Sequence, residues 1–369
     1  MEAKKKSKGL MALGIIVAII VAIAIIATAV ISIMTRPIDD KNKKAIAVGG
    51  MLSSESIDYK SESAKGLEKH PVMKIMQFIW KFCYYGDTAK HEKQTPPEHI
   101  VKNKNIPYID DGNLYHQLDV FYPEGTKPDD KLPVIIDIHG GGWMYATKDL
   151  NEYYCLSLAE RGYTVFSISY RLAPDVTVNE QIQDCASALK WISDNMASYP
   201  CNSEKIMLTG DSAGGMLAIY EAVIAQSEEL QDVFKTENPN LNIDALVLTS
   251  PVPYMKSGGG LSVYTKILWG KDYKEKETYG YMDLDEIIDY ADELAPTYLI
   301  TSSGDSLANA QTHKTYELLQ EKNIQSEIVD YGKVAGKKLP HVFSVLNPFD
   351  EAGKAAIDEE IAFFEKVTK

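Results

Sequence analysis

Short apolar runs alternate with longer stretches of helical pattern over most of the chain. The apolar runs predict strands at 118–122, 134–138, 164–169, 206–209, 245–249, 298–301 and 327–331. Apolar residues at helical spacing predict helices over 150–161, 178–196, 216–226, 312–322 and 352–367. The strand runs are apolar throughout instead of alternating with polar residues, which is typical of strands buried on both faces. We therefore expect an α/β fold with a mainly parallel sheet and helices on both faces.

A longer apolar run lies near the N-terminus. Leu10–Met34 contains 25 residues and no charge, which is enough for a helix to cross a hydrocarbon core of about 30 Å. Four lysines precede it and favour a cytoplasmic N-terminus, with the rest of the chain on the extracytoplasmic side: Lys4, Lys5, Lys6 and Lys8. Four basic residues follow closely and weaken that orientation: Arg36, Lys41, Lys43 and Lys44. The run predicts a single-pass transmembrane helix and membrane attachment.

A cleaved signal peptide is the alternative for this segment. Ala27-Thr28-Ala29 has the small-x-small form of a cleavage site, and cleavage would give a secreted protein. The apolar run continues to Met34, beyond that site, and is longer than a usual signal core. These two features favour the uncleaved anchor.

The remaining pattern divides the chain into segments. Residues 1–9 form a basic cytoplasmic N-terminus and 10–34 the transmembrane helix, whereas the polar 35–69 predicts a tether rather than a packed element. From Pro71 to Tyr85, apolar residues at helical spacing predict a core-facing helix, with part of a lid over the site as the alternative. Residues 251–292 interrupt the βα rhythm with aromatic and charged residues. We expect a catalytic domain over 70–369, with a cap from about 70–105 and 251–292.

Charge and cysteine content exclude several other classes. The 369-residue chain has a formal net charge of −14, and no basic cluster lies beyond its first residues, so nucleic acid is not expected as a partner. The four cysteines, at 83, 155, 185 and 201, are scattered without zinc-type spacing. Each is interpreted as a small core residue, and the spacing selects no disulfide pair.

The most informative motif is Gly210-Asp211-Ser212-Ala213-Gly214-Gly215. It lies between a predicted strand and a predicted helix, and a Gly-x-Ser-x-Gly at such a turn is the nucleophile elbow, which exposes one serine hydroxyl. Glycine is needed where a side chain would collide with the adjacent strand or helix. The helix N-terminus also favours negative charge developing beside Ser212. Ser212 is therefore the candidate nucleophile.

A second glycine-rich motif supplies candidate hydrogen-bond donors. His139-Gly140-Gly141-Gly142-Trp143 follows the strand predicted at 134–138, and glycine backbone N–H groups can approach a substrate closely. This placement matches the oxyanion-hole loop of lipases and esterases. The candidate donors are the N–H groups of Gly141, Gly142 and Ala213, and His139 is expected to brace the loop.

A serine nucleophile needs a base and a group that orients the base. Among seven histidines, His341 follows the last predicted strand and stands on a loop, as the base of this fold should. Asp305 lies in the loop after the strand at 298–301, at the same edge of the sheet as Ser212. The order Ser212, Asp305, His341 is that of the α/β-hydrolase triad.

These motifs together resemble one known family. The matching segments are His139-Gly140-Gly141-Gly142-Trp143, Tyr170-Arg171-Leu172-Ala173-Pro174, Gly210-Asp211-Ser212-Ala213-Gly214-Gly215, Asp305-Ser306-Leu307 and His341-Val342-Phe343. From about Leu114 onward, the chain is similar to the hormone-sensitive-lipase-like branch of the α/β hydrolases, the bacterial family IV carboxylesterases. The resemblance implies an eight-stranded sheet with a helical cap and hydrolysis of carboxylic esters with small or medium acyl groups. It also implies no metal and no organic cofactor.

Two positions depart from that family pattern. Asn309 stands where many members have a second aspartate after the acid, and Lys333–Lys338 resembles a basic, glycine-containing insertion before His341. Neither departure removes a catalytic group. The expected function is a membrane-anchored serine ester hydrolase. The alternatives are a deacetylase of O-acetylated carbohydrates or a peptidase on the same triad, and a non-catalytic receptor on this scaffold.

Overall fold

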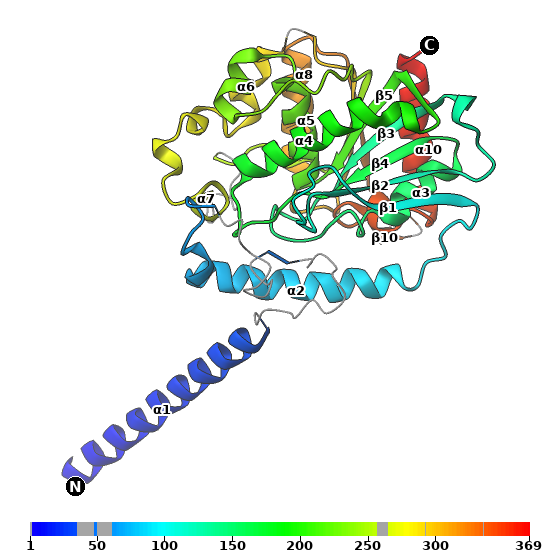
Figure 1. Ribbon diagram of the computed structural model, residues 1–369. Helices are drawn as coiled ribbons and strands as arrows, with labels where there is room; N and C mark the ends of the chain where they lie inside the picture. Colours follow the sequence, from blue (N-terminus) through cyan, green and yellow to red (C-terminus); the bar gives the residue numbers. More distant parts are fainter. Residues whose placement is uncertain (1, 35–47, 50–60, 257–264, 292, 335) are drawn as a thin grey trace.

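The computed structural model describes residues 2–34, 48–49, 61–256, 265–291, 293–334 and 336–369 (Figure 1). Parts of the expected tether and of the mid-chain cap segment, including Asp292, lie outside these ranges. The described chain contains one large α/β domain, from which the N-terminal helix α1 (Glu2–Met34) projects.

The centre of the domain is an eight-stranded sheet in the order β1-β2-β4-β3-β5-β6-β7-β8. Its strands are β1 (Ile100–Pro107), β2 (Gln117–Pro123), β3 (Leu132–Ile138), β4 (Thr164–Ile168), β5 (Cys201–Asp211), β6 (Ala245–Thr249), β7 (Thr297–Ser302) and β8 (Ser326–Tyr331). Strand β2 pairs antiparallel with β1 and β4, and the pairs from β4 to β8 are parallel. The predicted mainly parallel eight-stranded sheet is confirmed.

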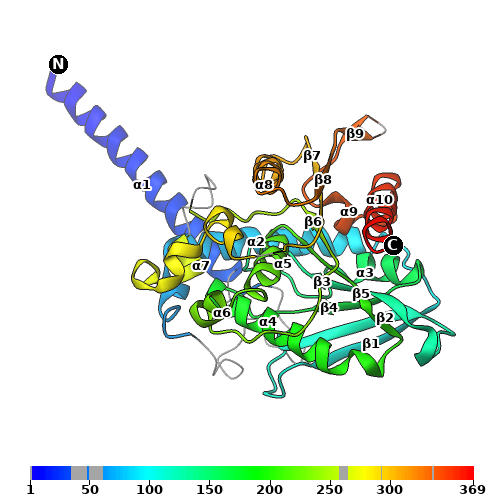
Figure 2. The same ribbon diagram turned by 90° about the horizontal axis from the view of Figure 1, so that it is seen from above.

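Helices cover both faces of the sheet because the central strands are apolar on both sides (Figures 1 and 2). Ile136 belongs to the core shared with α4 (Val178–Asn195), α5 (Ala213–Ile224) and α8 (Asn309–Glu321). Its neighbour Ile135 belongs to the opposite core, shared with α3 (Glu152–Glu160) and α10 (Glu351–Val367). Successive side chains on a strand point to opposite faces, so an unbroken apolar run serves both cores.

Several elements are absent from the sequence prediction, and strand β1 and helix α6 are two of them. Strand β1 has a mixed pattern with two lysines and lies at the sheet edge, where only one neighbour shields it. Helix α6 (Glu228–Phe234) is short and begins at Ser227, whose side chain accepts a hydrogen bond from Leu230 N. Edge strands and short helices carry too few periodic apolar residues for a pattern to detect them.

The N-terminal region holds the candidate anchor and a second helix. Residues Leu13–Ile33 of α1 are long and apolar enough to cross a membrane, a test that a signal sequence also passes. Helix α2 (Pro71–His91) lies along one side of the domain (Figure 1). Its apolar stripe was expected to face the core, but Ile75, Ile79 and Phe82 are exposed. The prediction was wrong for these residues because Met73, Gln77 and Lys81 occupy the buried face.

Described parts of the expected tether contact the domain. Val48 is buried and forms an antiparallel bridge with Tyr145, and Gly49 N donates to Met144 O at 2.8 Å. Farther along, Ala64 and Leu67 are also buried, the latter opening a short 3-10 helix, η2 (Leu67–Lys69). The chain is therefore attached to the domain well before α2 begins.

The mid-chain insertion consists of short helices. They are α7 (Thr265–Trp269), η6 (Tyr273–Glu275), η7 (Glu277–Tyr281), η8 (Leu284–Glu286) and η9 (Ile288–Tyr290). Trp269 and Tyr254 are almost completely buried, so these two aromatic rings serve packing. The segment lies beside α6 at one side of the domain (Figure 2). The expected boundaries of the cap remain a prediction.

Candidate active site

Ser212 stands at a sharp turn between β5 and α5. Its φ of 52° lies in the left-handed region, which is unusual for a residue with a side chain. A Cβ atom on Gly210 would lie 2.4 Å from Gly214 O, and one on Gly214 would lie 2.0 Å from Ile138 O. Only glycine therefore fits on either side of this turn. The strained turn holds the Ser212 hydroxyl at the carboxyl edge of the sheet.

His341 lies between Ser212 and Asp305. Its Nε2 is 2.9 Å from Ser212 Oγ, and its Nδ1 is 2.8 Å from Asp305 Oδ2. An ionised carboxylate can only accept hydrogen bonds, so the neutral imidazole carries its proton on Nδ1. Nε2 is then free to accept the hydroxyl proton of Ser212. The structure thus brings the three predicted catalytic side chains together across large sequence separations.

Asp305 is held as an ionised group. Burial raises the pKa of its carboxyl, but the hydrogen bond and charge of His341 and the N–H of Ala308 outweigh burial and lower the pKa below its usual value. Its Oδ1 accepts from Leu307 N at 2.9 Å and from Ala308 N at 3.0 Å. These two bonds fix one oxygen and leave Oδ2 for the imidazole.

The glycine loop, residues 139–143, reaches the same edge from the end of β3. Gly141 and Gly142 have φ values of 113° and 56°, and a Cβ atom on Gly141 would lie 2.0 Å from Tyr145 O. Within the described ranges, the N–H groups of Gly141, Gly142 and Ala213 donate to no protein acceptor. Ala213 is also the first residue of α5, where backbone N–H groups lack helical partners. These groups are available to a ligand oxygen.

A buried polar network lies beneath this loop. Asp211 Oδ1 accepts from Gly140 N and from Asn151 Nδ2, both at 2.9 Å. Asn151 Nδ2 also contacts the Asp137 carboxylate at 3.1 and 3.2 Å. Burial and the nearby charge of Asp211 raise the pKa of Asp137 to about 7. The sequence pattern does not indicate this network, because its members come from β3, from the residue before α3 and from β5.

His139 is positioned as a structural residue. Burial lowers the pKa of its imidazole to about 4, so the ring is neutral. It stacks on Tyr170 with ring centroids 4.3 Å apart, and Nδ1 lies 2.7 Å from Gly140 O. Tyr170 OH donates to His139 O at 2.8 Å. The geometry agrees with the expectation that His139 braces the loop.

Helix α2 covers the glycine loop from the outside. A Cβ atom on Gly142 would lie 2.5 Å from Trp80 Cζ2, and the Trp80 ring stacks on Tyr145 at 5.4 Å. Tyr145 OH donates to Asp87 Oδ2 at 3.0 Å, which ties the end of α2 to the same loop. Trp80 was not singled out from the sequence, although it lies within the helix predicted from Pro71 to Tyr85.

Two carboxylates of the mid-chain insertion and two positions that depart from the family pattern have partners of their own. Asp283 Oδ1 accepts from Lys256 N at 2.6 Å, and Asp289 pairs with Lys322. Asn309, at the position where the family pattern has an aspartate, donates to Asp330 Oδ2 at 3.0 Å. The predicted basic insertion forms a small hairpin of β9 (Lys333–Val334) and β10 (Lys337–Lys338).

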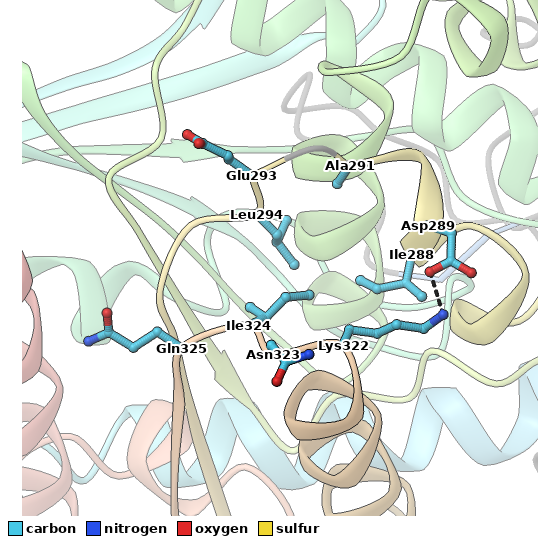
Figure 3. Close-up of a pocket in the computed structure, with 9 residues that line it drawn as sticks. All are labelled: Ile288, Asp289, Ala291, Glu293, Leu294, Lys322, Asn323, Ile324 and Gln325. Atoms are coloured by element: carbon cyan, nitrogen blue, oxygen red, sulfur yellow. Dashed lines mark hydrogen bonds and ion pairs between the residues drawn. The ribbon is translucent and has the colours of Figure 1, made fainter.

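One pocket lies far from these residues (Figure 3). It is formed where the chain enters β7 and β8, at the amino edge of the parallel strands, whereas Ser212 is at the carboxyl edge. Its lining residues are Ile288, Asp289, Ala291, Glu293, Leu294, Lys322, Asn323, Ile324 and Gln325. The pocket is therefore separate from the candidate active site.

The family model named BD-FAE matches residues 118–311, which include β2 to β7, the glycine loop, Ser212 and Asp305. The chain belongs to the BD-FAE family. Together with the solved structure reported below, this match confirms the resemblance to α/β-hydrolase esterases that the motifs indicated.

Curated relatives of this family member include lipases and esterases. Lipase 2 of Geotrichum candidum is 32% identical over 157 residues, which cover 38% of this chain and 27% of the lipase. Versiconal hemiacetal acetate esterase of Dothistroma septosporum is 35% identical over 158 residues, covering 42% of this chain and 46% of that esterase. The chain thus matches less than half of the length of these relatives.

A solved structure extends the likeness over the whole domain. Esterase B from Lactobacillus rhamnosis, inhibited by a tributyrin phosphonate, is similar with a TM-score of 0.75 and 29% identity. The match covers 80% of this chain and 94% of the esterase. The lipase and esterase relatives and this solved structure therefore support an esterase of the α/β-hydrolase type.

Proposed function

We propose that this protein is a serine carboxylic-ester hydrolase that uses Ser212, His341 and Asp305. The observation that carries the proposal is the continuous relay from Ser212 Oγ through His341 to Asp305 Oδ2, with distances of 2.9 and 2.8 Å. The esterase and lipase relatives support the same reaction class.

In the proposed reaction, His341 Nε2 takes the Ser212 proton as Oγ bonds to the ester carbonyl carbon. The negative charge on the former carbonyl oxygen is stabilised by the N–H groups of Gly141, Gly142 and Ala213. His341 then gives its proton to the departing alcohol, leaving an acyl group on Ser212. Water repeats the sequence and releases the carboxylic acid. Asp305 orients the imidazole and stabilises its charged form.

Small or medium acyl groups are the proposed substrates. Esterase B is inhibited by a phosphonate related to tributyrin, whose acyl groups are short, and another relative is named as an acetate esterase. An ester panel in which acyl length and alcohol vary independently, with acetylated carbohydrates and peptide amides included, tests this preference. Faster release of acetate from carbohydrates than from simple esters would favour the deacetylase alternative.

The central test is Ser212→Ala. This variant should lose nearly all hydrolysis of a chromogenic butyrate ester, because no other hydroxyl is placed against His341 Nε2 in the described structure, while its far-UV circular dichroism stays unchanged. Ser187→Ala is a suitable control, since Ser187 is a partly buried serine of α4 whose hydroxyl donates within that helix to Gln183 O at 2.8 Å. Full hydrolysis by Ser212→Ala would refute the proposal.

We also propose that α1 anchors the domain at the extracytoplasmic side of a membrane. The apolar span Leu13–Ile33 of α1 contains no charge, and the lysines at the start of the same helix precede that span; both features support this arrangement. Protease digestion of intact cells should remove the domain if it is outside. Retention of an uncleaved N-terminus in the membrane fraction distinguishes an anchor from a signal peptide.

A further inference from the structure

Helix α2 carries large apolar side chains on two opposite faces, although its buried inner face also includes Gln77 and Lys81. Its inner face packs on the domain through Met73 and Trp80, and Gln77 Nε2 donates to Gly49 O at 2.9 Å. A surface helix usually presents one apolar face to the core and a polar face to water. A second apolar face therefore requires its own explanation.

The second face consists of five residues, here named the outer stripe: Ile75, Phe78, Ile79, Phe82 and Tyr85. Four of them expose a large part of their surface, namely 49% for Ile75, 43% for Ile79, 57% for Phe82 and 53% for Tyr85. Ile75, Phe78, Ile79 and Phe82 follow the i, i+3, i+4, i+7 spacing of one helix face. Contiguous exposed apolar side chains of this kind mark an interaction surface.

The position of Val48 and Gly49 limits what this surface can meet. Both residues are attached to the domain next to α2, through the Tyr145 bridge, Met144 O and the Gln77 side chain. Only residues 35–47 separate them from the end of α1, and a chain of this length spans at most about 50 Å even when fully extended. If α1 spans a membrane, the face of the domain that carries α2 is held close to that membrane.

We infer that the outer stripe docks on the lipid surface of the membrane in which α1 is anchored. An α2 of 21 residues is about 30 Å long and would lie in the plane of the interface, with aliphatic and phenyl side chains among the acyl chains. Tyr85, in the second half of the helix, has the amphipathic ring typical of membrane interfaces.

Apolar insertion, and not charge attraction, drives this contact. The chain has a net charge of −14, which disfavours approach to an anionic surface. The outer stripe itself contains no charged residue. Docking is therefore expected on zwitterionic phosphatidylcholine and needs no anionic lipid.

Docking would place the candidate active site next to the lipid. Trp80, on the inner face of α2, lies against Gly142 of the glycine loop, so one helix separates the bilayer from the proposed oxyanion site. This consequence rests on the proposed esterase function: the substrates would be esters dissolved in the membrane, and they would reach Ser212 past α2.

The docking test uses the full chain reconstituted in phosphatidylcholine vesicles. Phe82→Trp introduces a fluorescent reporter in the outer stripe, and Asp232→Trp introduces one at an exposed position of α6, on the far side of the domain from α2 (Figure 1). Replacing the lipid by brominated phosphatidylcholine should quench most of the emission added by Phe82→Trp and almost none of that added by Asp232→Trp. Equal quenching of the two reporters would overturn the inference.

A second measurement follows the substrate. The double variant Ile79→Asn/Phe82→Asn should hydrolyse a long-chain ester held in the vesicles about tenfold more slowly, because two partly inserted apolar side chains are lost. Hydrolysis of a soluble butyrate ester should be unchanged, which also shows that the variant is folded. An unchanged ratio of the two rates would refute the membrane route.

Two outcomes separate the possible failures. If the unmodified chain does not hydrolyse the soluble ester, the proposed function fails, but the quenching experiment still decides the docking. If the Phe82→Trp reporter is shielded from brominated lipid and the full chain cross-links as a dimer through α2, a second copy covers the outer stripe and the lipid assignment is wrong.

Discussion

Asp211 Oδ1 accepts a hydrogen bond from Gly140 N at 2.9 Å. This bond joins the residue before the proposed nucleophile to the first glycine of the proposed oxyanion loop. A Cβ atom on Gly140 would lie 2.3 Å from Asp211 Oδ2, so the contact also depends on glycine. The elbow and the loop are thus held together as one unit.

Asp211→Ala should lower kcat/KM by about 10²-fold, since the loop that presents Gly141 and Gly142 loses its support. It should also destabilise the fold by about 1–3 kcal/mol, because the buried Gly140 N is left without a partner, whereas Asn151 Nδ2 keeps the Asp137 carboxylate. Asp211→Asn keeps an acceptor for Gly140 N and should retain most of the activity. Kinetics and thermal unfolding of both variants check this prediction, and an unaffected kcat/KM in Asp211→Ala would contradict it.

Gly142→Ala tests the contact between α2 and the glycine loop. The added methyl group would lie 2.5 Å from Trp80 Cζ2, and the φ of 56° is unfavourable for alanine. We expect at least about a tenfold loss of ester hydrolysis, because the loop or Trp80 must move. Gly112→Ala is the matched control: its φ of 75° is equally unfavourable, but its Cβ would be in open space. Equal activity of the two variants would argue against the role of this contact.

Asp305→Asn should reduce kcat by about 10³–10⁴-fold, because an amide no longer stabilises the charged imidazole or fixes its tautomer. The binding of a competitive inhibitor should change little. Asp285, an exposed carboxylate in the mid-chain insertion, supplies the control variant Asp285→Asn, which should keep normal activity. A similar modest effect in both variants would remove Asp305 from the proposed triad.

Glu360 makes stability depend on pH. Burial raises the pKa of its carboxyl from 4.5 to about 8, although the Tyr154 hydrogen bond and the charge of Arg161 oppose that change. Its pKa is thus higher in the folded than in the unfolded chain, and its contribution to stability is complete below about pH 4.5 and declines as the pH rises to about 8. Glu360→Gln should therefore flatten the fall in Tm over that range. Exposed Glu317→Gln should not, and an identical slope in all three proteins would contradict this assignment.

The sequence predicted what depends on local pattern. The seven predicted strands are present because runs such as 134–138 are apolar on both faces, and the elbow was recognisable because Gly210 and Gly214 flank Ser212 at fixed spacing. Chain order and loop position selected Asp305 and His341, since the carboxyl ends of parallel strands share one edge.

Long-range contacts were not predictable in the same way. Asn151 reaches Asp211 across 60 positions in the chain, and nothing local to either residue indicates that pair. The stripe on α2 shows a related limit: periodicity identified the helix, but with apolar residues on two faces it did not determine which one packs on the domain. The resemblance to esterases likewise gave no information about Trp80.

The central claim is that Ser212 is the nucleophile of an ester hydrolase, and labelling by a short-chain phosphonate tests it most directly. The full chain should gain one phosphonyl group, found by mass spectrometry on the peptide that contains Ser212, in parallel with the loss of butyrate-ester hydrolysis. Ser212→Ala should gain none, and His341→Ala should react far more slowly. Labelling at another residue, or full inactivation without a label on Ser212, would contradict the account.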